Sequence, residues 1–180
     1  MTWFVVDVEA DGPYPGVGDN GYSMASFGIA VVKEGTPVGY YSGPLKPTGY
    51  LIDENAIKVH GLDYEERKAK GKALVVAIAE LEKFVENNNT GRPVFISDNL
   101  AFDWQFINFA SHFTLERNIF GHSGRRIGDI YSGWIGRTDA SSWKKYRITR
   151  HTHNPLDDAM GNVEALLELR KQGMPVILDR

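Results

Sequence analysis

"WFVVDVEADG" at residues 3–12 is the stretch that decides the fold. Its apolar run, residues 3–8, predicts a central strand that is buried on both faces. Residues two apart in a strand point to the same face, so we expect Asp7 and Glu9 to lie side by side near the end of the strand. Two close carboxylates repel each other unless a positive group lies between them. The stretch therefore predicts a buried strand that ends beside a positive charge.

The segments that follow predict one α/β domain over residues 1–180. Residues 11–21 are dense in Gly, Pro and Asn, which predicts a loop, and 114–126 is also loop-like. Further strands are expected at 23–33, 37–45 and 94–97. Hydrophobic spacing and capping residues predict helices at 53–61, 72–86, 100–113, 128–136, 141–147 and 156–171. An antiparallel meander followed by a strand–helix–strand order indicates a mixed central sheet flanked by helices, with a parallel strand beside the meander.

Composition is typical of a soluble globular chain, with 42% hydrophobic and 24% charged residues among 180. No apolar run approaches the ~20 residues of a membrane helix, and no signal-peptide pattern precedes the first strand, so we expect no membrane partner. The chain has no cysteine, which excludes disulfides and thiolate metal sites and fits a cytoplasmic location.

The chain is weakly negative overall but locally positive. A net charge of −3 argues against a protein that coats duplex nucleic acid, but not against an enzyme that holds a few nucleotides at a strand end. The run WKKYRITRH at 143–151 has two interpretations: a solvated helix face, or a patch that follows phosphates, with Trp143 and Tyr146 available to stack on bases. The second interpretation predicts substrate contacts from Trp143, Lys144, Lys145, Arg147 and Arg150.

Two more acids and a histidine occupy positions that fit a metal-dependent reaction. Asp103 lies one turn into a predicted helix, and Asp158 lies in the first turn of the last helix, five residues after His153. Hard cations such as Mg²⁺ and Mn²⁺ prefer oxygen ligands, and two of them about 4 Å apart can hold both oxygens of a phosphodiester displacement. Asp7, Glu9 and Asp158 could supply one such site, and Asp7 could bridge to a second. His153 could take a proton from the attacking water.

Three motifs occur in one order along the chain: DVE at 7–9, NLAFD at 99–103 and HNPLDD at 153–158. In that order they resemble the DEDDh 3′-5′ exonuclease superfamily, which includes ribonuclease T, oligoribonuclease and the proofreading subunit of bacterial replicative polymerase. The resemblance implies a ribonuclease H-like fold, with His153 as general base. It implies that two Mg²⁺ or Mn²⁺ ions are bound by four acids: Asp7, Glu9, Asp103 and Asp158. It also implies substrate contacts at Ala10, Asp11, Gly12 and Asn99.

By the same resemblance, the chain is a metal-dependent exonuclease that removes nucleotides from the 3′ end of single-stranded RNA or DNA and releases nucleoside 5′-monophosphates. The alternative is a module of the same fold that binds nucleic acid without hydrolysing it. Many free-standing relatives are homodimers, so this chain is a candidate for one. The chain departs from the family pattern after Glu9, where Ala10 replaces the usual threonine and residues 11–21 are longer than the family's simple turn.

The motifs leave some assignments open. Three nearby residues could replace motif residues: Asp157, Asp98 and His151. The five-residue spacing favours Asp158 and His153. Placement in the helix turn, rather than at the strand end, favours Asp103 over Asp98. We expect Asp11 to be a loop acid. We expect three further histidines to be surface or packing residues: His60, His112 and His122. A stripe typical of a core is formed by Phe102, Phe106, Phe109 and Phe113.

Overall fold

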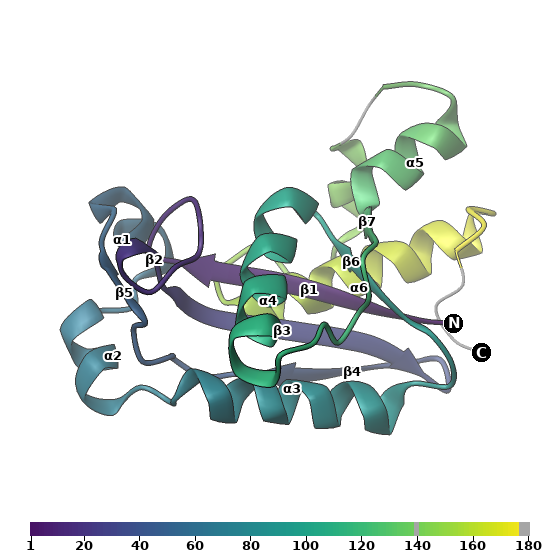
Figure 1. Cartoon of the computed structure of the whole chain (residues 1–180). Helices are drawn as coiled ribbons and strands as arrows, with labels where there is room; N and C mark the ends of the chain where they lie inside the picture. The colour runs from purple at the N-terminus through teal and green to yellow at the C-terminus, as the bar shows by residue number, and fades with distance from the viewer. Residues whose placement is uncertain (139–140, 177–180) are drawn as a thin grey trace.

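A five-stranded sheet in the order β4-β3-β1-β6-β7 forms the centre of the fold (Figure 1). The computed structural model describes residues 1–138 and 141–176. The strands of this sheet are β1 (Thr2–Ala10), β3 (Met24–Lys33), β4 (Thr36–Tyr41), β6 (Pro93–Ser97) and β7 (Gly124–Arg126). Strand β1 pairs antiparallel with β3 and parallel with β6, so the predicted mixed sheet is confirmed.

Helices cover both faces of the sheet. They are α1 (Glu54–His60), α2 (Tyr64–Lys70), α3 (Leu74–Asn88), α4 (Leu100–Leu115), α5 (Ile127–Ile135), the 3-10 helix η1 (Ser142–Tyr146) and α6 (Pro155–Lys171). Alternate residues of β1 point to opposite faces: Phe4 and Val6 pack with α3 and α4, whereas Val5 packs with α6. Asp7 and Glu9 continue the Val5 face, so β1 directs both carboxylates toward the side of the sheet that α6 covers.

Two predicted loops contain strands. Predicted loop 11–21 includes β2 (Gly18–Tyr22), which pairs in parallel with β5 (Gly49–Leu51) in a separate two-stranded sheet. Predicted loop 114–126 includes β7. Both corrections have the same physical reason. The sequences GDNGY, GYL and GRR are too short and too rich in glycine to show an alternating hydrophobic pattern, so these strands form through pairing with distant partners.

Other elements match the predictions to different degrees. Helix α1 is capped by Asp53 and ends at Gly61 in the left-handed region, as predicted. Predicted strand 37–45 ends at Tyr41, shortly before Gly43, whose φ is 75°. Helix α2 was not predicted because its sequence, YEERKAK, has no apolar stripe. In the described part of the chain, none of the helices combines the length and the apolar character needed to span a bilayer.

Candidate active site

The start of α6 packs close to the acidic end of β1 because the neighbouring residue of β3, Gly28, has no side chain. A Cβ atom on Gly28 would lie 2.3 Å from backbone atoms of Pro155 and Leu156, which is closer than real Cβ contacts allow. Asn154 caps α6, and its side chain accepts a hydrogen bond from the Leu156 N–H at 3.0 Å. The first turn of α6 therefore presents Asp158, which is 1% exposed, to β1.

Four carboxylates meet at the end of β1, and we call them the acid cluster: Asp7, Glu9, Asp103 and Asp158. The ligand oxygens of Asp7, Glu9 and Asp158 lie within 4.8 Å of one another. Asp103 comes from the first turn of α4, on the opposite face of the sheet, and is 2% exposed. Its Oδ1 accepts a hydrogen bond from the Val8 N–H at 3.1 Å. The structure thus brings together all four acids of the predicted metal set.

The acid cluster carries more negative charge than its surroundings neutralise. Burial is the largest cause that raises the pKa of Asp7 well above its usual range, and the charges of Asp103 and Asp158 raise it further. Burial also raises the pKa of Glu9 to about 7 and the pKa of Asp103 to about 8. Arg147, whose Nη2 lies 3.1 Å from Asp158 Oδ1, opposes the shift of Asp7. A site in this electrostatic state is stabilised by a bound cation.

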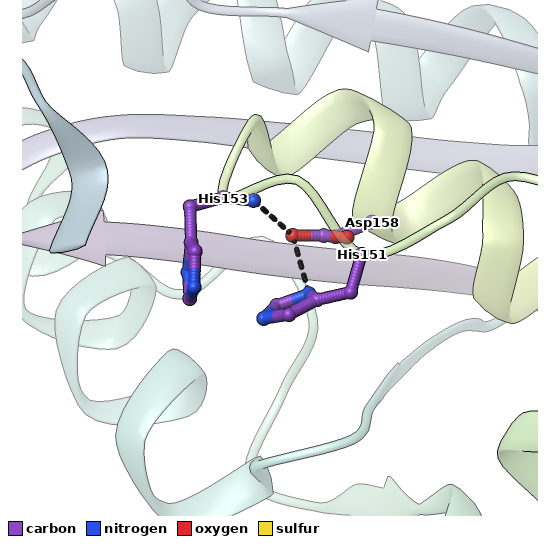
Figure 2. Close-up of side chains that lie close together, drawn as sticks. All are labelled: His151, His153 and Asp158. Atoms are coloured by element: carbon purple, nitrogen blue, oxygen red, sulfur yellow. Dashed lines mark hydrogen bonds and ion pairs between the residues drawn. The ribbon is translucent and has the colours of Figure 1, made fainter.

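Two histidines flank Asp158 (Figure 2). The backbone N–H of His153 donates to Asp158 Oδ2 at 3.1 Å, and His153 Nδ1 lies 3.4 Å from Glu9 Oε1. The Nδ1 atom of His151 lies 2.8 Å from the same Oδ2. The two imidazole rings meet edge to face, with centroids 4.2 Å apart. Both the predicted base and its rival therefore lie beside the acid cluster.

The two rival acids make other interactions. Asp98 Oδ2 forms an ion pair with Lys144 Nζ at 2.6 Å. Asp157 Oδ2 accepts a hydrogen bond from the Thr152 hydroxyl at 3.2 Å. His112 is exposed, in agreement with the surface role expected for it.

Asp11 lies in the loop after β1, as predicted, but its burial was not expected. The residue is fully buried. Its Oδ1 accepts a hydrogen bond from Arg67 Nη2 and lies 3.6 Å from His60 Nε2. Its backbone carbonyl accepts a hydrogen bond from the Asp53 N–H at 2.8 Å. Asp11 thus ties α1 and α2 to the end of β1. The sequence did not indicate this pairing because Arg67 lies 56 residues further along the chain.

A pocket of about 340 Å³ adjoins the acid cluster at Glu9. This volume falls in the range of roughly 300–1,000 Å³ that is typical of small-ligand pockets. Its walls include the predicted substrate contacts Ala10 and Gly12, whereas Asn99 lies exposed at the N-terminus of α4. The other wall residues were not predicted as substrate contacts: Asn55, Ala56 and Val59 from α1, its cap Asp53, and Pro13 and Phe102.

The basic run at 143–151 is exposed only in part. Trp143 is 0% exposed and packs in the core with α6, so the prediction that its ring is available to stack on bases is wrong. Arg147 is occupied by Asp158, and its side chain is 9% exposed. Lys144 pairs with Asp98 yet stays exposed, as do Lys145 and Arg150.

Gly28 and Arg67 position the site but were not singled out from the sequence. For Gly28 a signal existed, since an isolated glycine in the apolar strand sequence MASFGIAVVK indicates close approach of another backbone. The sequence gives no signal for the burial of Arg67, because a charged residue in a polar helix is ordinarily solvated.

Comparisons with known proteins agree with this geometry. The chain is 31% identical over 169 residues to the 3′-5′ DNA exonuclease Cap18 of Escherichia coli, a match that covers 93% of this chain and 85% of that protein. It is similar to the nuclease domain of 3′hExo, a DEDDh family member, bound to rAMP, with a TM-score of 0.67 and 11% identity over 99% of this chain and 96% of that one. It is also similar to the zinc-bound complex of E. coli ExoI with ssDNA, with a TM-score of 0.65 and 14% identity over 96% of this chain and 41% of that one. No family model matches the sequence.

The solved structures share the fold, and the match to Cap18 extends over most of both chains. The fold is therefore the predicted ribonuclease H-like one, with a mixed sheet flanked by helices. The DEDDh enzymes depend on divalent metals, which agrees with the close carboxylates of Asp7, Glu9 and Asp158. The chain belongs to the DEDDh 3′-5′ exonuclease superfamily and is a 3′-5′ exonuclease.

Proposed function

We propose that the chain removes nucleotides one at a time from the 3′ end of single-stranded nucleic acid and releases nucleoside 5′-monophosphates. The relative Cap18 is named as a DNA exonuclease, which favours DNA over RNA as the substrate of this chain. The acid cluster is the observation that carries the proposal, because its carboxylates lie close together and both burial and their mutual repulsion raise the pKa of Asp7.

The acid cluster fits divalent cations by its donor atoms and by its charge. Ligands that are all carboxylate oxygens suit Mg²⁺ and Mn²⁺. Asp7, Glu9 and Asp158 would hold one ion, and Asp7 with Asp103 would hold a second. Two ions bound there would supply positive charge for the attacking and leaving oxygens of a phosphodiester.

His153 takes the proton of the attacking water in this proposal. Its Nδ1 lies 3.4 Å from Glu9 Oε1, which favours a proton on Nδ1 and leaves Nε2 free to accept another. The side chain is 41% exposed, so water has access to it. The N–H of His153 bonded to Asp158 holds this base close to the acid cluster.

The pocket beside Glu9 would hold the terminal nucleotide, with the backbone of Ala10 and Gly12 along its wall. The exposed side chains of Lys145 and Arg150 would follow the phosphates of the preceding nucleotides. Their contribution is electrostatic, so binding of the strand is expected to weaken as salt rises.

The experiment compares Asp158→Asn with Asp157→Asn, its neighbour in the same motif. The substrates are 5′-labelled single strands of DNA and of RNA, with Mg²⁺ and with a chelator. Loss of an outer-shell partner already costs about 10–100-fold, so loss of a direct ligand in Asp158→Asn is expected to lower the rate by more than 100-fold. Asp157→Asn is expected to retain most of the activity.

Robust hydrolysis by Asp158→Asn in excess Mg²⁺ would contradict the proposal. A closed circular single strand is the substrate control, since an exonuclease leaves it intact and an endonuclease does not. A homodimer and a cytoplasmic location stay predictions from the resemblance and the cysteine-free sequence. Size-exclusion chromatography with light scattering checks the first, and cell fractionation checks the second.

A further inference from the structure

His151 has no part in the exonuclease motifs, yet it is one of three potential metal ligands gathered in the segment 151–158. Nitrogen atoms of His151 and His153 and an oxygen of Asp158 all lie within 4.8 Å of one another. The two imidazole rings lie next to each other beside the Asp158 carboxylate (Figure 2). Their side chains are 53% and 41% exposed, so a cation from solvent has access to both.

The Asp158 carboxylate is oriented so that its two oxygens serve different partners. Oδ1 is occupied by Arg147 Nη2 at 3.1 Å and by the Thr152 N–H at 3.2 Å. Oδ2 faces His151, whose Nδ1 is 2.8 Å away. Oδ2 also accepts a hydrogen bond from the His153 N–H at 3.1 Å. The ligand-facing oxygen therefore belongs to a carboxylate that is fixed by burial and hydrogen bonds, while the two imidazoles reach solvent.

This donor set selects a different class of cation from the acid cluster. Two imidazoles and one carboxylate suit Zn²⁺ and similar transition-metal ions, which bind mixed N and O sites more tightly than Mn²⁺ does, whereas Mg²⁺ prefers oxygen ligands alone. A tetrahedral Zn²⁺ site with bonds of about 2.0–2.1 Å needs ligand atoms roughly 3.3 Å apart. The distance of 2.8 Å between His151 Nδ1 and Asp158 Oδ2 is near this spacing, and the three ligand atoms all lie within 4.8 Å of one another.

We infer that His151, His153 and Asp158 form a transition-metal site at the edge of the acid cluster, and that Zn²⁺ bound there inhibits the enzyme. Zn²⁺ would occupy the imidazole of His153 and one oxygen of Asp158, so it would compete with the use of both in hydrolysis. The inhibitory effect rests on the proposed function of His153, whereas Zn²⁺ binding does not. Inhibition by Zn²⁺ is thus expected even when Mg²⁺ is in excess.

The test of binding is calorimetric titration of the full chain with Zn²⁺ in excess Mg²⁺, for the wild type, His151→Gln and His112→Gln. His112 is an exposed histidine on α4, so its variant controls for loss of an imidazole elsewhere. Loss of an outer-shell partner costs about 10–100-fold in affinity, so loss of the His151 ligand is expected to weaken Zn²⁺ binding at least tenfold. His112→Gln is expected to bind as the wild type does. Zn²⁺ binding by His151→Gln within about twofold of the wild type would overturn the site.

A second measurement locates the ion and separates binding from inhibition. Imidazole nitrogen resonances of His151 and His153 are expected to shift with Zn²⁺, while those of the buried His60 are not. Zn²⁺ should inhibit the Mg²⁺-dependent rate of the wild type, and the concentration needed should rise at least tenfold in His151→Gln, each measured against its own uninhibited rate. His151-dependent binding with no effect on the rate would support the site and overturn its inhibitory role. Shifts confined to other histidines would overturn the site itself.

Discussion

Glu9 and Asp11 are two residues apart, and both are buried, yet their carboxylates have opposite surroundings. The Asp11 carboxylate contacts the guanidinium of Arg67 and the imidazole of His60, and all three side chains are buried. Glu9 lies beside Asp158 and Asp7, and burial raises its pKa to about 7 although His60 and His151 lower it. Asp11 is paired with a buried guanidinium, whereas the positive groups near Glu9 are imidazoles.

The difference separates an acid with a structural ion pair from an acid that the proposed function assigns to metal binding. Burying a charge is costly unless it is paired, so a fold keeps such groups only where a partner exists. For Asp11 the partner is a side chain, and its effect is to hold α1 and α2 against β1. For the acid cluster the proposed partner is a cation from solution, since Arg147 forms an ion pair with Asp158 alone and lowers the raised pKa of Asp7 only in part.

Replacing Arg67, whose guanidinium is paired with Asp11, should cause the largest loss of stability. Arg67→Met leaves Asp11 buried beside His60 alone, and breaking a buried ion pair costs about 3–5 kcal/mol. Urea unfolding of the chelated protein measures this, with the exposed neighbour Lys68→Met as control. Replacing both partners, in Asp11→Leu with Arg67→Met, should recover part of the loss. If Arg67→Met and Lys68→Met have equal free energies of unfolding, Asp11 is not stabilised by Arg67. The contrast between Asp11 and the acid cluster would then be lost.

The geometry of the acid cluster can be changed without substituting any of its four acids. In Gly28→Ala the new methyl group collides with the backbone of Pro155, which pushes Asp158 away from β1 and leaves the Asp11 group intact. Overpacking of this kind costs about 1–3 kcal/mol, and a shift of ~1 Å at a reacting centre can cost about 10²-fold in rate. Unfolding and kcat are measured together. The control is Gly133→Ala, whose Cβ meets nothing within 4 Å, and equal activity of the two variants would show that α6 does not depend on this contact.

The pH dependence of the metal-free protein should show a smaller effect of defined sign. The pKa values of Glu9, about 7, and Asp103, about 8, exceed the unfolded values of about 4.3 and 3.9. Between these limits the folded state binds more protons than the unfolded state, so the free energy of unfolding falls as pH rises from about 4 to about 8. Each group contributes a slope of at most about 1.4 kcal/mol per pH unit.

Urea unfolding in chelator at several pH values measures this slope, and Glu9→Gln should reduce it. His112→Gln serves as the comparison, because its side chain lies on the surface of α4. Stability that increases from pH 5 to 8 in the wild type would contradict the account of unbalanced carboxylates.

The parts of the site that were predicted correctly depend on local patterns. The strand that ends in Asp7 and Glu9 follows from an apolar run, and the start of α6 follows from Asn154 and Pro155. The order of the three motifs then indicated which acids belong together, and the structure brings those acids into one cluster.

The parts that failed depend on partners far away in the sequence. A buried Asp11 requires Arg67, and the burial of Trp143 requires α6 to pack over it, and neither fact is visible within a short window. Strands β2 and β5 exist because they pair with each other rather than because of their own composition. Local chemistry predicts what a segment can do, and the choice among long-range partners comes from the packing of the whole fold.

The most direct test of the central claim is thermal unfolding of the wild type and of Asp7→Asn at about pH 8, each in chelator and in Mg²⁺. Without metal, Asp7→Asn should be the more stable protein, because the substitution removes a buried charge whose pKa is strongly raised. With Mg²⁺ at about 100 times its dissociation constant the wild type should gain about 2.7 kcal/mol, and the variant far less. An Asp7→Asn protein that is less stable in chelator, and that gains as much from Mg²⁺ as the wild type, would contradict the claim that the acid cluster is built for cations.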